Sequence, residues 1–358
     1  MENEKTALRG ALLPARPKYL ALQAPEDVLE PEIEIIDSHH HLWDVKGHHS
    51  DMLRGESDRY LVEEYAQDVT TGHNVVASVF LEYHAMYRAE GDPRFRSVGE
   101  VEFAAGMAAM AESGAYGKTH TAAAIVGQAD MNLGAEVTPV LEAHTQVGGG
   151  RFRGVRHSAG WTDDSSVRLS KTARGPGQYL RPEFHEGVRA LSRLGLTLDA
   201  FLFHHQLIDV VKLASAVPEA QIALCHCGGP LGFSTERGHQ KEVYELWKKN
   251  MTEVARCENV SVKLGGMLIR LNAFDYVSDA AKPPTSQELA RLWGPFIETT
   301  IELFGANRCM FESNFPVEKM GVSFAVLWNA FKRTTASATE AEKVDLYAGT
   351  ARRFYRMS

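Results

Sequence analysis

The chain has 358 residues, of which 44% are hydrophobic and 23% are charged, as is typical of a globular domain. A net charge of −8 without a concentrated basic run argues against a nucleic-acid partner. The four cysteines predict no disulfide framework, and neither a signal-peptide pattern nor an apolar run of about 18 residues is present, so we expect a reduced, cytoplasmic protein with no membrane partner.

The first segment is irregular and rich in proline. Residues 1–31 show neither helical nor strand periodicity. We expect an N-terminal arm that wraps the domain or meets a second subunit, which makes a homodimer one arrangement to test. Residues 32–358 are expected to form one domain.

From residue 33 onward, apolar runs of strand length alternate with helical patterns. The alternation predicts a parallel sheet with helical crossovers, and a count of eight fits a closed barrel better than an open sheet. We therefore expect an α/β protein, a distorted (β/α)8 TIM barrel. The expected strands are Ile33–Ser38, Val75–Glu82, Thr121–Gly127, Phe152–Arg156, Leu196–Leu202, Gln221–His226, Val260–Leu264 and Arg308–Phe311.

Helices are expected between these strands, and some connections are long. The expected helices include Val98–Ser113, Glu183–Leu194, Gln206–Val217, Lys241–Cys257, Gln287–Phe304 and Val322–Arg333. Long connections that follow strands lie on the carboxyl face of a barrel and shape its substrate pocket. Here they are Val45–Asp58, Tyr83–Ser97, Ser158–Arg181 and Leu268–Thr285.

The clearest local motif is Asp-Ser-His-His-His, residues 37–41, at the end of the first expected strand. Because residues two apart on a strand point to the same side, His39 and His41 can converge on one ion. Imidazole nitrogen suits Zn²⁺, and a His-x-His pair is a frequent half-site. The alternative is a set of surface histidines, which the apolar strand before them disfavours.

Another histidine has a comparable position. His226 ends an apolar run and precedes a Gly-Gly-Pro sequence, which predicts a sharp exit onto the barrel face. A histidine there is expected to bind a metal or act in catalysis, although a lone buried histidine is more often a core residue. Cys225 and Cys227 are weaker ligand candidates, because alternation points them away from His226.

Charged groups lie in or at the end of three further strands. Glu82 is a candidate ligand or general acid/base. Arg156, His157 and Lys263 are candidates for binding a substrate carboxylate or polarising a carbonyl. For Lys263, a structural pair with a buried acid is an equally good alternative.

The last motif is Phe-Glu-Ser-Asn-Phe-Pro, residues 311–316. It forms the end of the eighth expected strand and its exit turn. We expect Ser313 and Asn314 to face the same site as His39 and His226, because the carboxyl ends of barrel strands share one face.

Taken in order, these motifs resemble the amidohydrolase superfamily, in particular the metal-dependent TIM-barrel hydrolases that include sugar-acid, pyrone-dicarboxylate and muconolactone-type lactonases. The resemblance runs from about Ile35 to the C-terminus and rests on Asp-x-His-x-His, Gly-Val-Arg-His, His-x-Gly-x-Pro-Leu, Val-x-Val-Lys-Leu and Ser-Asn-Phe-Pro-Val. It implies one divalent ion, with Zn²⁺ expected, and the implied ligands are His39, His41, His204 and His226. For His204, which follows the fifth strand beside His205, a place at the start of the next helix is the alternative. Some of the resembling lactonases act without a metal, so a metal-free site is also open.

The chain departs from the family's pattern in its last motif. The family usually has Asp at the position of Asn314 and Gly at that of Glu312. That Asp commonly takes a proton from the attacking water, which an amide cannot do. Glu82 or Glu312 could supply the base instead, and Glu312 is the weaker candidate because it lies deeper in the barrel.

The resemblance implies hydrolysis of a lactone C–O bond in a small anionic organic acid by metal-activated water. Two alternatives stay open, namely metal-dependent non-oxidative decarboxylation of a small carboxylic acid and a non-catalytic ligand-binding barrel. The expected catalytic residues are His226, Asn314, Glu82 and Lys263. The expected substrate-binding residues are Arg156, His157 and His204.

Overall fold

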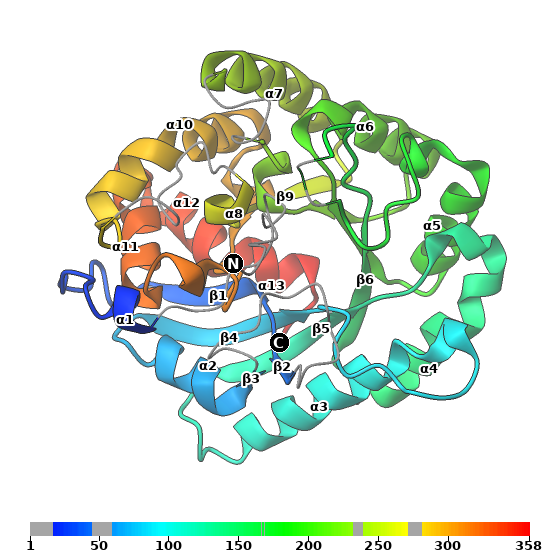
Figure 1. Cartoon of the computed structure of the whole chain (residues 1–358), viewed down its shortest axis with the longest axis horizontal. Helices are drawn as coiled ribbons and strands as arrows, with labels where there is room; N and C mark the ends of the chain where they lie inside the picture. The colour runs from blue at the N-terminus through cyan, green and yellow to red at the C-terminus, as the bar shows by residue number, and fades with distance from the viewer. Residues whose placement is uncertain (1–16, 45–58, 166, 168, 232–238, 271–280) are drawn as a thin grey trace, which may run out of the picture.

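The computed structural model describes residues 17–44, 59–165, 167, 169–231, 239–270 and 281–358 (Figure 1). Eight parallel strands form one sheet in the order β1-β4-β5-β6-β7-β8-β9-β10, curled into a nearly closed barrel. The predicted (β/α)8 barrel is thereby confirmed. Its strands are β1 (Glu34–His40), β4 (Asn74–Leu81), β5 (His120–Gly127), β6 (Phe152–Ser158), β7 (Thr197–Phe201), β8 (Ile222–Leu224), β9 (Val260–Leu264) and β10 (Cys309–Phe311).

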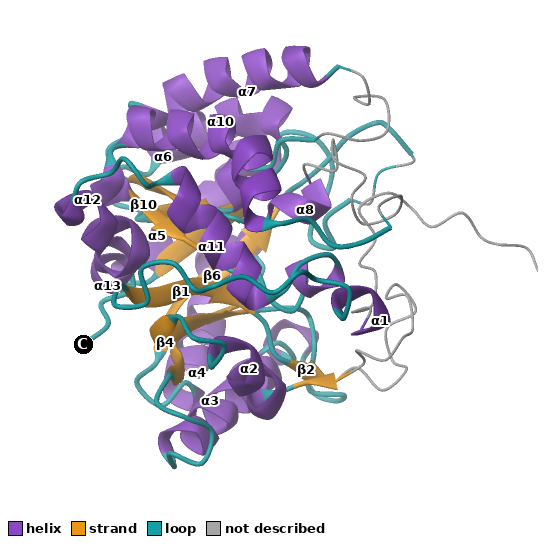
Figure 2. Ribbon diagram, turned by 90° about the vertical axis from the view of Figure 1, so that its left-hand side faces the viewer, coloured by secondary structure: helices purple, strands orange, loops and turns teal. Residues whose placement is uncertain are grey.

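Helices surround the strands, as Figures 1 and 2 show from two directions. None of the helices in the described ranges is both long and apolar enough to cross a membrane. The helices are α1 (Pro17–Leu20), α2 (Val62–Val69), α3 (Val98–Glu112), α4 (Thr138–Val147), α5 (Pro182–Arg193), α6 (Leu207–Ala216), α7 (Gln240–Ala255), α8 (Met267–Arg270), α10 (Ser286–Phe304), α11 (Phe324–Thr334), α12 (Glu340–Val344) and α13 (Thr350–Phe354).

The connections on the carboxyl face are irregular where they are described. Tyr83–Ser97 and Ser158–Arg181 contain short 3₁₀ turns at Pro93–Phe95 and Gln178–Leu180. The expected loop Val45–Asp58 lies outside the described residues, and a small hairpin of β2 (Trp43–Asp44) and β3 (Arg59–Tyr60) flanks it.

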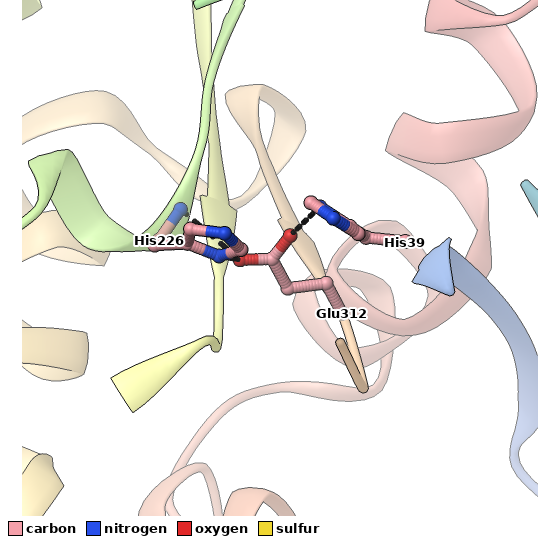
Figure 3. Close-up of side chains that lie close together, drawn as sticks. All are labelled: His39, His226 and Glu312. Carbon is pink, nitrogen blue, oxygen red and sulfur yellow. Dashed lines mark hydrogen bonds and ion pairs between the residues drawn. The ribbon is translucent and has the colours of Figure 1, made fainter. Parts of the chain in front are cut away.

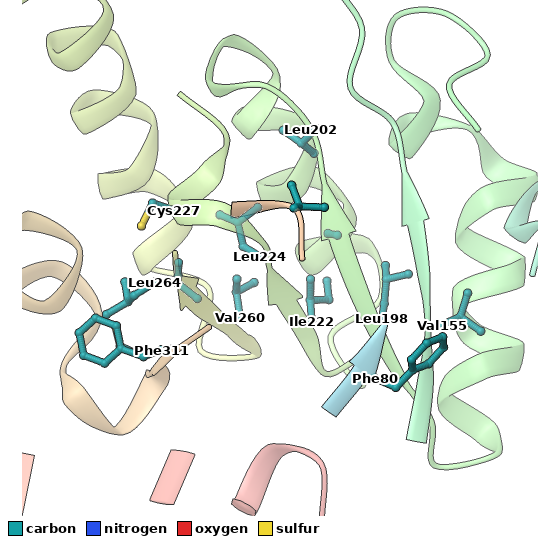
Figure 4. Packing of buried hydrophobic residues seen from close by; sticks show 14 of the residues in the cluster. Phe80, Val155, Leu198, Leu202, Ile222, Leu224, Cys227, Val260, Leu264 and Phe311 are labelled. Atoms are coloured by element: carbon teal, nitrogen blue, oxygen red, sulfur yellow. The ribbon is translucent and has the colours of Figure 1, made fainter. Parts of the chain in front are cut away.

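Apolar residues pack on both faces of the strands. Outward-facing residues such as Phe80, Val155 and Leu198 form the core between barrel and helices (Figure 4). A smaller cluster, which includes Val79 and Met310, fills the barrel itself. The two clusters follow strand alternation, because successive side chains point to opposite faces of the sheet.

The interior of the barrel also holds a charged pair. Lys263 Nζ lies 2.6 Å from Asp199 Oδ1, and both side chains are fully buried. Asp199 also accepts a hydrogen bond of 2.8 Å from the hydroxyl of Tyr355, which follows α13. Lys263 donates to the carbonyl oxygen of Ser38 at 2.8 Å, which ties this layer to β1.

The barrel closes between β1 and the residues after β10. Asn314 N donates to the carbonyl oxygen of His39 at 2.8 Å, and His41 N donates to that of Phe315 at 2.7 Å. A parallel bridge joins His40 to Phe315 between these two bonds. The seam of the barrel therefore consists of residues from the two motifs that the sequence singled out.

The described part of the N-terminal segment lies against the last helices. Leu29 N donates to Asn329 Oδ1 at 2.9 Å. The ammonium of Lys332, in α11, donates to the carbonyl oxygens of Leu29 and Glu30 at 2.8 Å. Residues just before β1 are thus fastened to the barrel's outer layer by buried polar contacts.

The pair of Lys263 and Asp199 gives a prediction about stability. Lys263→Met leaves a carboxylate unpaired in the barrel interior, so we expect a loss of roughly 3–5 kcal/mol in the free energy of unfolding, measured in urea. Adding Asp199→Asn removes that charge and keeps an acceptor for Tyr355, so the double variant should regain most of the loss. A loss below about 1 kcal/mol in the single variant would show that the pair is not needed.

Candidate active site

Five polar side chains meet at the carboxyl ends of three strands. His39 and His41 come from the end of β1, His226 follows β8, and Glu312 and Asn314 follow β10. All five are buried, with His226 the most exposed at 8%. His226 and Asn314 have positive φ angles of 56° and 53°, a region that residues other than glycine rarely adopt. Such backbone strain is concentrated at functional sites in proteins.

The carboxylate of Glu312 lies between two imidazoles (Figure 3). Its Oε1 is 2.6 Å from His226 Nδ1 and accepts a second hydrogen bond of 3.0 Å from His226 N. Its Oε2 is 2.6 Å from His39 Nδ1. Potential ligand atoms of these three residues lie within 4.8 Å of one another, so they form a group that could hold a metal ion.

Two glycines after β9 make room for this group. A Cβ on Gly266 would lie 1.9 Å from His226 Nδ1, and one on Gly265 would lie 2.5 Å from the side chain of Glu312. Gly266 also has a φ of +61°, which side chains rarely adopt. The Gly-Gly pair is therefore part of the site, although the sequence analysis did not single it out.

The contacts of His39 fix the position of its ring proton. Its Nε2 lies 3.3 Å from Arg156 Nη1, which can only donate a hydrogen bond, so Nε2 accepts. Burial, and next the nearby charge of Lys263, hold the pKa of His39 well below its usual range, so the ring is neutral. Its single proton then lies on Nδ1, beside Glu312.

His41 presents a second unprotonated nitrogen. Its Nδ1 lies 2.9 Å from the carbonyl oxygen of Leu81, which requires a proton there. Burial, and next the charge of Arg156, keep the pKa of His41 well below its usual range, so its Nε2 carries a lone pair. That atom is 3.2 Å from His39 Nε2 and 3.3 Å from Asn314 Oδ1.

Glu318 determines which end of the Asn314 amide faces the site. Glu318 is fully buried and its Oε1 accepts a hydrogen bond of 3.2 Å from Asn314 Nδ2. Its Oε2 accepts another of 2.9 Å from Leu268 N. The amide oxygen of Asn314 is therefore turned toward His41.

The donor set fits a divalent metal ion. His41 Nε2 lies close to both His39 Nε2 and Asn314 Oδ1, and a cation bound to these three atoms would replace the hydrogen bond that Arg156 Nη1 donates to His39 Nε2. Their separations of 3.2 and 3.3 Å match the roughly 3.3 Å between tetrahedral ligands at Zn–N distances of about 2.0–2.1 Å. By contrast, the 2.6 Å contacts of Glu312 with His39 and His226 are too short for neighbouring ligands of one ion and are those of an ion pair and a hydrogen bond.

Arg156 and Glu82 form an ion pair beside this centre. Arg156 Nε donates to Glu82 Oε1 at 2.7 Å, and its Nη2 donates to the carbonyl oxygen of Glu82. Burial raises the pKa of Glu82, but Arg156 and His84 together outweigh burial, so the net pKa is lowered. Glu82 is thus an ionised partner of Arg156, and its lowered pKa makes it a weaker proton acceptor than an unpaired carboxylate.

Glu100 lies next to this pair and is neutral. Burial, and next the charge of Glu82, raise its pKa well above the usual range. Its Oε1 accepts hydrogen bonds from Tyr83 N and Ala85 N at 2.7 and 2.9 Å, so it supports the loop after β4.

The structure does not bring His157 or His204 into the cluster. His157 points outward because Arg156, its neighbour on β6, points inward. It accepts a hydrogen bond from Met131 N, and burial lowers its pKa to about 4. His204 begins a 3₁₀ turn after β7, where its Nδ1 accepts from Leu231 N. The strand ends at Phe201, too early for His204 to lie at its tip, and His204 has the helix-start position that was the alternative.

Lys263 and Ser313 also have structural partners. Lys263 forms the buried pair with Asp199, which is the alternative to the predicted catalytic role. The Ser313 hydroxyl donates to Asp37 Oδ2 at 2.6 Å and its backbone N to Asp37 Oδ1 at 2.8 Å. Ser313 thus fastens the exit turn to β1 instead of facing the site with Asn314.

Sequence comparison relates the chain to known proteins. The amidohydrolase family model matches residues 36–357. The uncharacterized protein y4mH of Sinorhizobium fredii is 30% identical over 343 residues, 91% of this chain and 99% of that protein. An L-fucono-1,5-lactonase of Burkholderia multivorans is 24% identical over 236 residues, 66% of this chain and 72% of that protein.

Solved structures share the fold. An amidohydrolase from Burkholderia multivorans with bound Zn superposes with a TM-score of 0.64 at 22% identity, covering 90% of this chain and 99% of that one. A 5-carboxyvanillate decarboxylase from Sphingomonas paucimobilis gives 0.55 at 15% identity, covering 91% and 100%. The same fold therefore occurs in hydrolases and in decarboxylases.

The space that Gly266 leaves for His226 can be tested with a matched pair of variants. Gly266→Ala places a Cβ 1.9 Å from His226, whereas Gly195, with a similar φ of +68°, has nothing within 4 Å. Both variants should lose about 1–2 kcal/mol from left-handed backbone strain. Gly266→Ala should lose roughly 1–3 kcal/mol more from overpacking, as measured by urea unfolding. Equal losses of unfolding free energy in the two variants would mean that His226 does not need the space at Gly266.

Proposed function

This chain belongs to the amidohydrolase family, and we propose that it hydrolyses the ester bond of a lactone of a small hydroxy acid. The observation that carries the proposal is that His41 Nε2 lies 3.2 Å from His39 Nε2 and 3.3 Å from Asn314 Oδ1, beside an imidazole–carboxylate pair. The similarity to an L-fucono-1,5-lactonase supports a lactone as the substrate class.

We propose that His39, His41 and Asn314 hold one divalent ion, with Zn²⁺ as the first candidate. Such an ion, when bound, polarises a carbonyl and lowers the pKa of bound water. His39 and His41 contribute neutral nitrogens, and Asn314 contributes an amide oxygen that Glu318 has oriented. Leu81 O and Glu318 hold His41 and Asn314 by hydrogen bonds, and Glu312 holds His39 by an ion pair, which preorganises the set.

His226 is the proposed acceptor of the proton from water. Its Nδ1 is bonded to Glu312, so Nε2 is the atom that takes up the proton. A carboxylate on the far side of an imidazole orients the ring and stabilises its protonated form. Attack of water on the carbonyl carbon breaks the ring C–O bond, and His226 then returns the proton to the leaving oxygen.

Arg156 is proposed to stabilise the negative charge that develops on the carbonyl oxygen. The pair with Glu82 holds its guanidinium beside the centre, and an ion on His39 Nε2 would free Arg156 Nη1, 3.3 Å away, to donate to that oxygen. Because Glu82 already neutralises this cation, we propose an uncharged lactone ring as substrate instead of the anionic acid that the sequence suggested.

A lactone panel with matched histidine variants tests the proposal. We expect turnover of at least one sugar-acid lactone, followed by proton release in weakly buffered solution. His41→Ala should lower kcat/KM by more than the roughly 10- to 100-fold that loss of an outer ligand partner costs, because a ligand itself is lost. His205→Ala should retain activity, because His205 is exposed and its Nε2 contacts a backbone oxygen, that of Trp161.

The same assays separate the alternatives. Removal of metal by a chelator should abolish turnover, and added Zn²⁺ should restore it. Release of CO₂ from a small carboxylic acid without lactone opening would replace the proposal with decarboxylation. Tight ligand binding without turnover at every metal loading would leave a binding protein.

A further inference from the structure

The two departures from the family pattern lie two residues apart on the same strand exit. A carboxylate is present at Glu312, and an amide replaces the usual carboxylate at Asn314. We propose that these departures compensate each other: Glu312 supplies the negative charge of the metal centre from behind His39 and His226, as a positioning residue rather than a ligand. This inference rests on the ligand set proposed above.

The contacts of Glu312 support this role. Its carboxylate accepts hydrogen bonds from His226 N and His226 Nδ1 and forms an ion pair with His39 Nδ1. The side chain is fully buried, where an ionised carboxylate needs partners to offset the cost of desolvation. The neighbouring glycine Gly265 leaves space for it, since a Cβ there would overlap the Glu312 side chain.

The geometry explains why one carboxylate serves two rings. His39 and His226 are held with their centroids 4.8 Å apart, and each presents its Nδ1 to a different oxygen of Glu312. A hydrogen bond from a ligating histidine to a carboxylate fixes the tautomer and makes the other nitrogen a stronger donor. Glu312 thus directs Nε2 of His39 toward His41 and fixes the orientation of His226 at the same time.

Asn314 is the uncharged one of the two residues that depart from the family pattern. Its amide nitrogen is bound to Glu318, so only its oxygen is directed at His41. With Asn at this position, all three proposed ligands are uncharged. The negative charge nearest to His39 then lies on Glu312, whose Oε2 is 2.6 Å from His39 Nδ1.

Zinc affinity measured by competition with a chromophoric chelator tests the exchange without using activity. Glu312→Gln should weaken Zn²⁺ binding by about 10- to 100-fold, the usual effect of losing such a partner. Asn314→Asp combined with Glu318→Gln swaps amide and carboxylate and keeps the hydrogen bond between them. In this swapped background a ligand carries the charge, so Glu312→Gln should weaken binding only a few-fold.

Glu100→Gln is the matched control. Glu100 is buried and its raised pKa keeps it protonated, so glutamine mimics its existing state and zinc affinity should not change. Glu312→Asp, which withdraws the carboxylate by one methylene, is the second variant if Glu312→Gln does not fold. It should also weaken binding in the original background and less so in the swapped one.

Three results would overturn the inference. They are a wild type that binds no Zn²⁺, unchanged affinity in a folded Glu312 variant, and an equal loss in both backgrounds. Lactone turnover is scored separately. If no lactone is hydrolysed but the Glu312 variants bind Zn²⁺ as weakly as expected, the substrate class is rejected and the role of Glu312 is kept. If a lactone is hydrolysed but the Glu312 variants bind Zn²⁺ as tightly as the wild type, the substrate class is kept and the role of Glu312 is rejected.

Discussion

The site depends on the seam that closes the barrel. The hydrogen bonds from Asn314 N to the His39 oxygen and from His41 N to the Phe315 oxygen join the first strand to the exit of the last. Because the backbone atoms that close the sheet belong to the residues whose side chains form the site, closure also sets the distances between those side chains. A shift of the pairing by one residue at this seam would turn the side chains of the strand to the opposite face of the sheet. The precision of the cluster is therefore a consequence of the fold's topology.

Burial of charge is the second constraint, and charges are buried both inside the barrel and at its rim. Lys263 and Asp199 neutralise each other inside it, and Arg156 and Glu82 do so at its rim. In a medium of low dielectric constant such pairs are strong, and an unpaired histidine stays neutral because protonation would add an uncompensated charge. Burial above all, and next the charge of Lys263 for His39 and of Arg156 for His41, lowers the pKa of both histidines, so that both can offer a lone pair. The electrostatic design thus prepares the donor set before any ligand binds.

The sequence predicted those features that depend on periodicity. Apolar runs identified the eight strands, and alternation brought His39 and His41 to one side. Alternation also assigns Arg156 and His157 to opposite faces, and the error at His157 came from treating both as strand-end groups. His204 was misplaced because the strand ends at Phe201, a boundary that local propensity does not fix. Gly266 acts through a contact with His226 on a distant segment, which no local pattern reveals. Glu318 lies only four residues after Asn314, but its second hydrogen bond goes to Leu268 N in another segment.

The exchange at the last motif illustrates how a familiar pattern can mislead. Judged by position alone, Asn314 suggests that the catalytic carboxylate has been lost, and Glu312 appears too deep to replace it. Depth is an advantage for a group that acts through imidazoles, because Glu312 can reach two Nδ1 atoms that face away from the donor set. A carboxylate that orients and polarises a ring from behind needs hydrogen-bond distance to the ring and shielding from water, and Glu312 has both. The contacts of the carboxylate therefore determine its role in the site more than its position in the motif does.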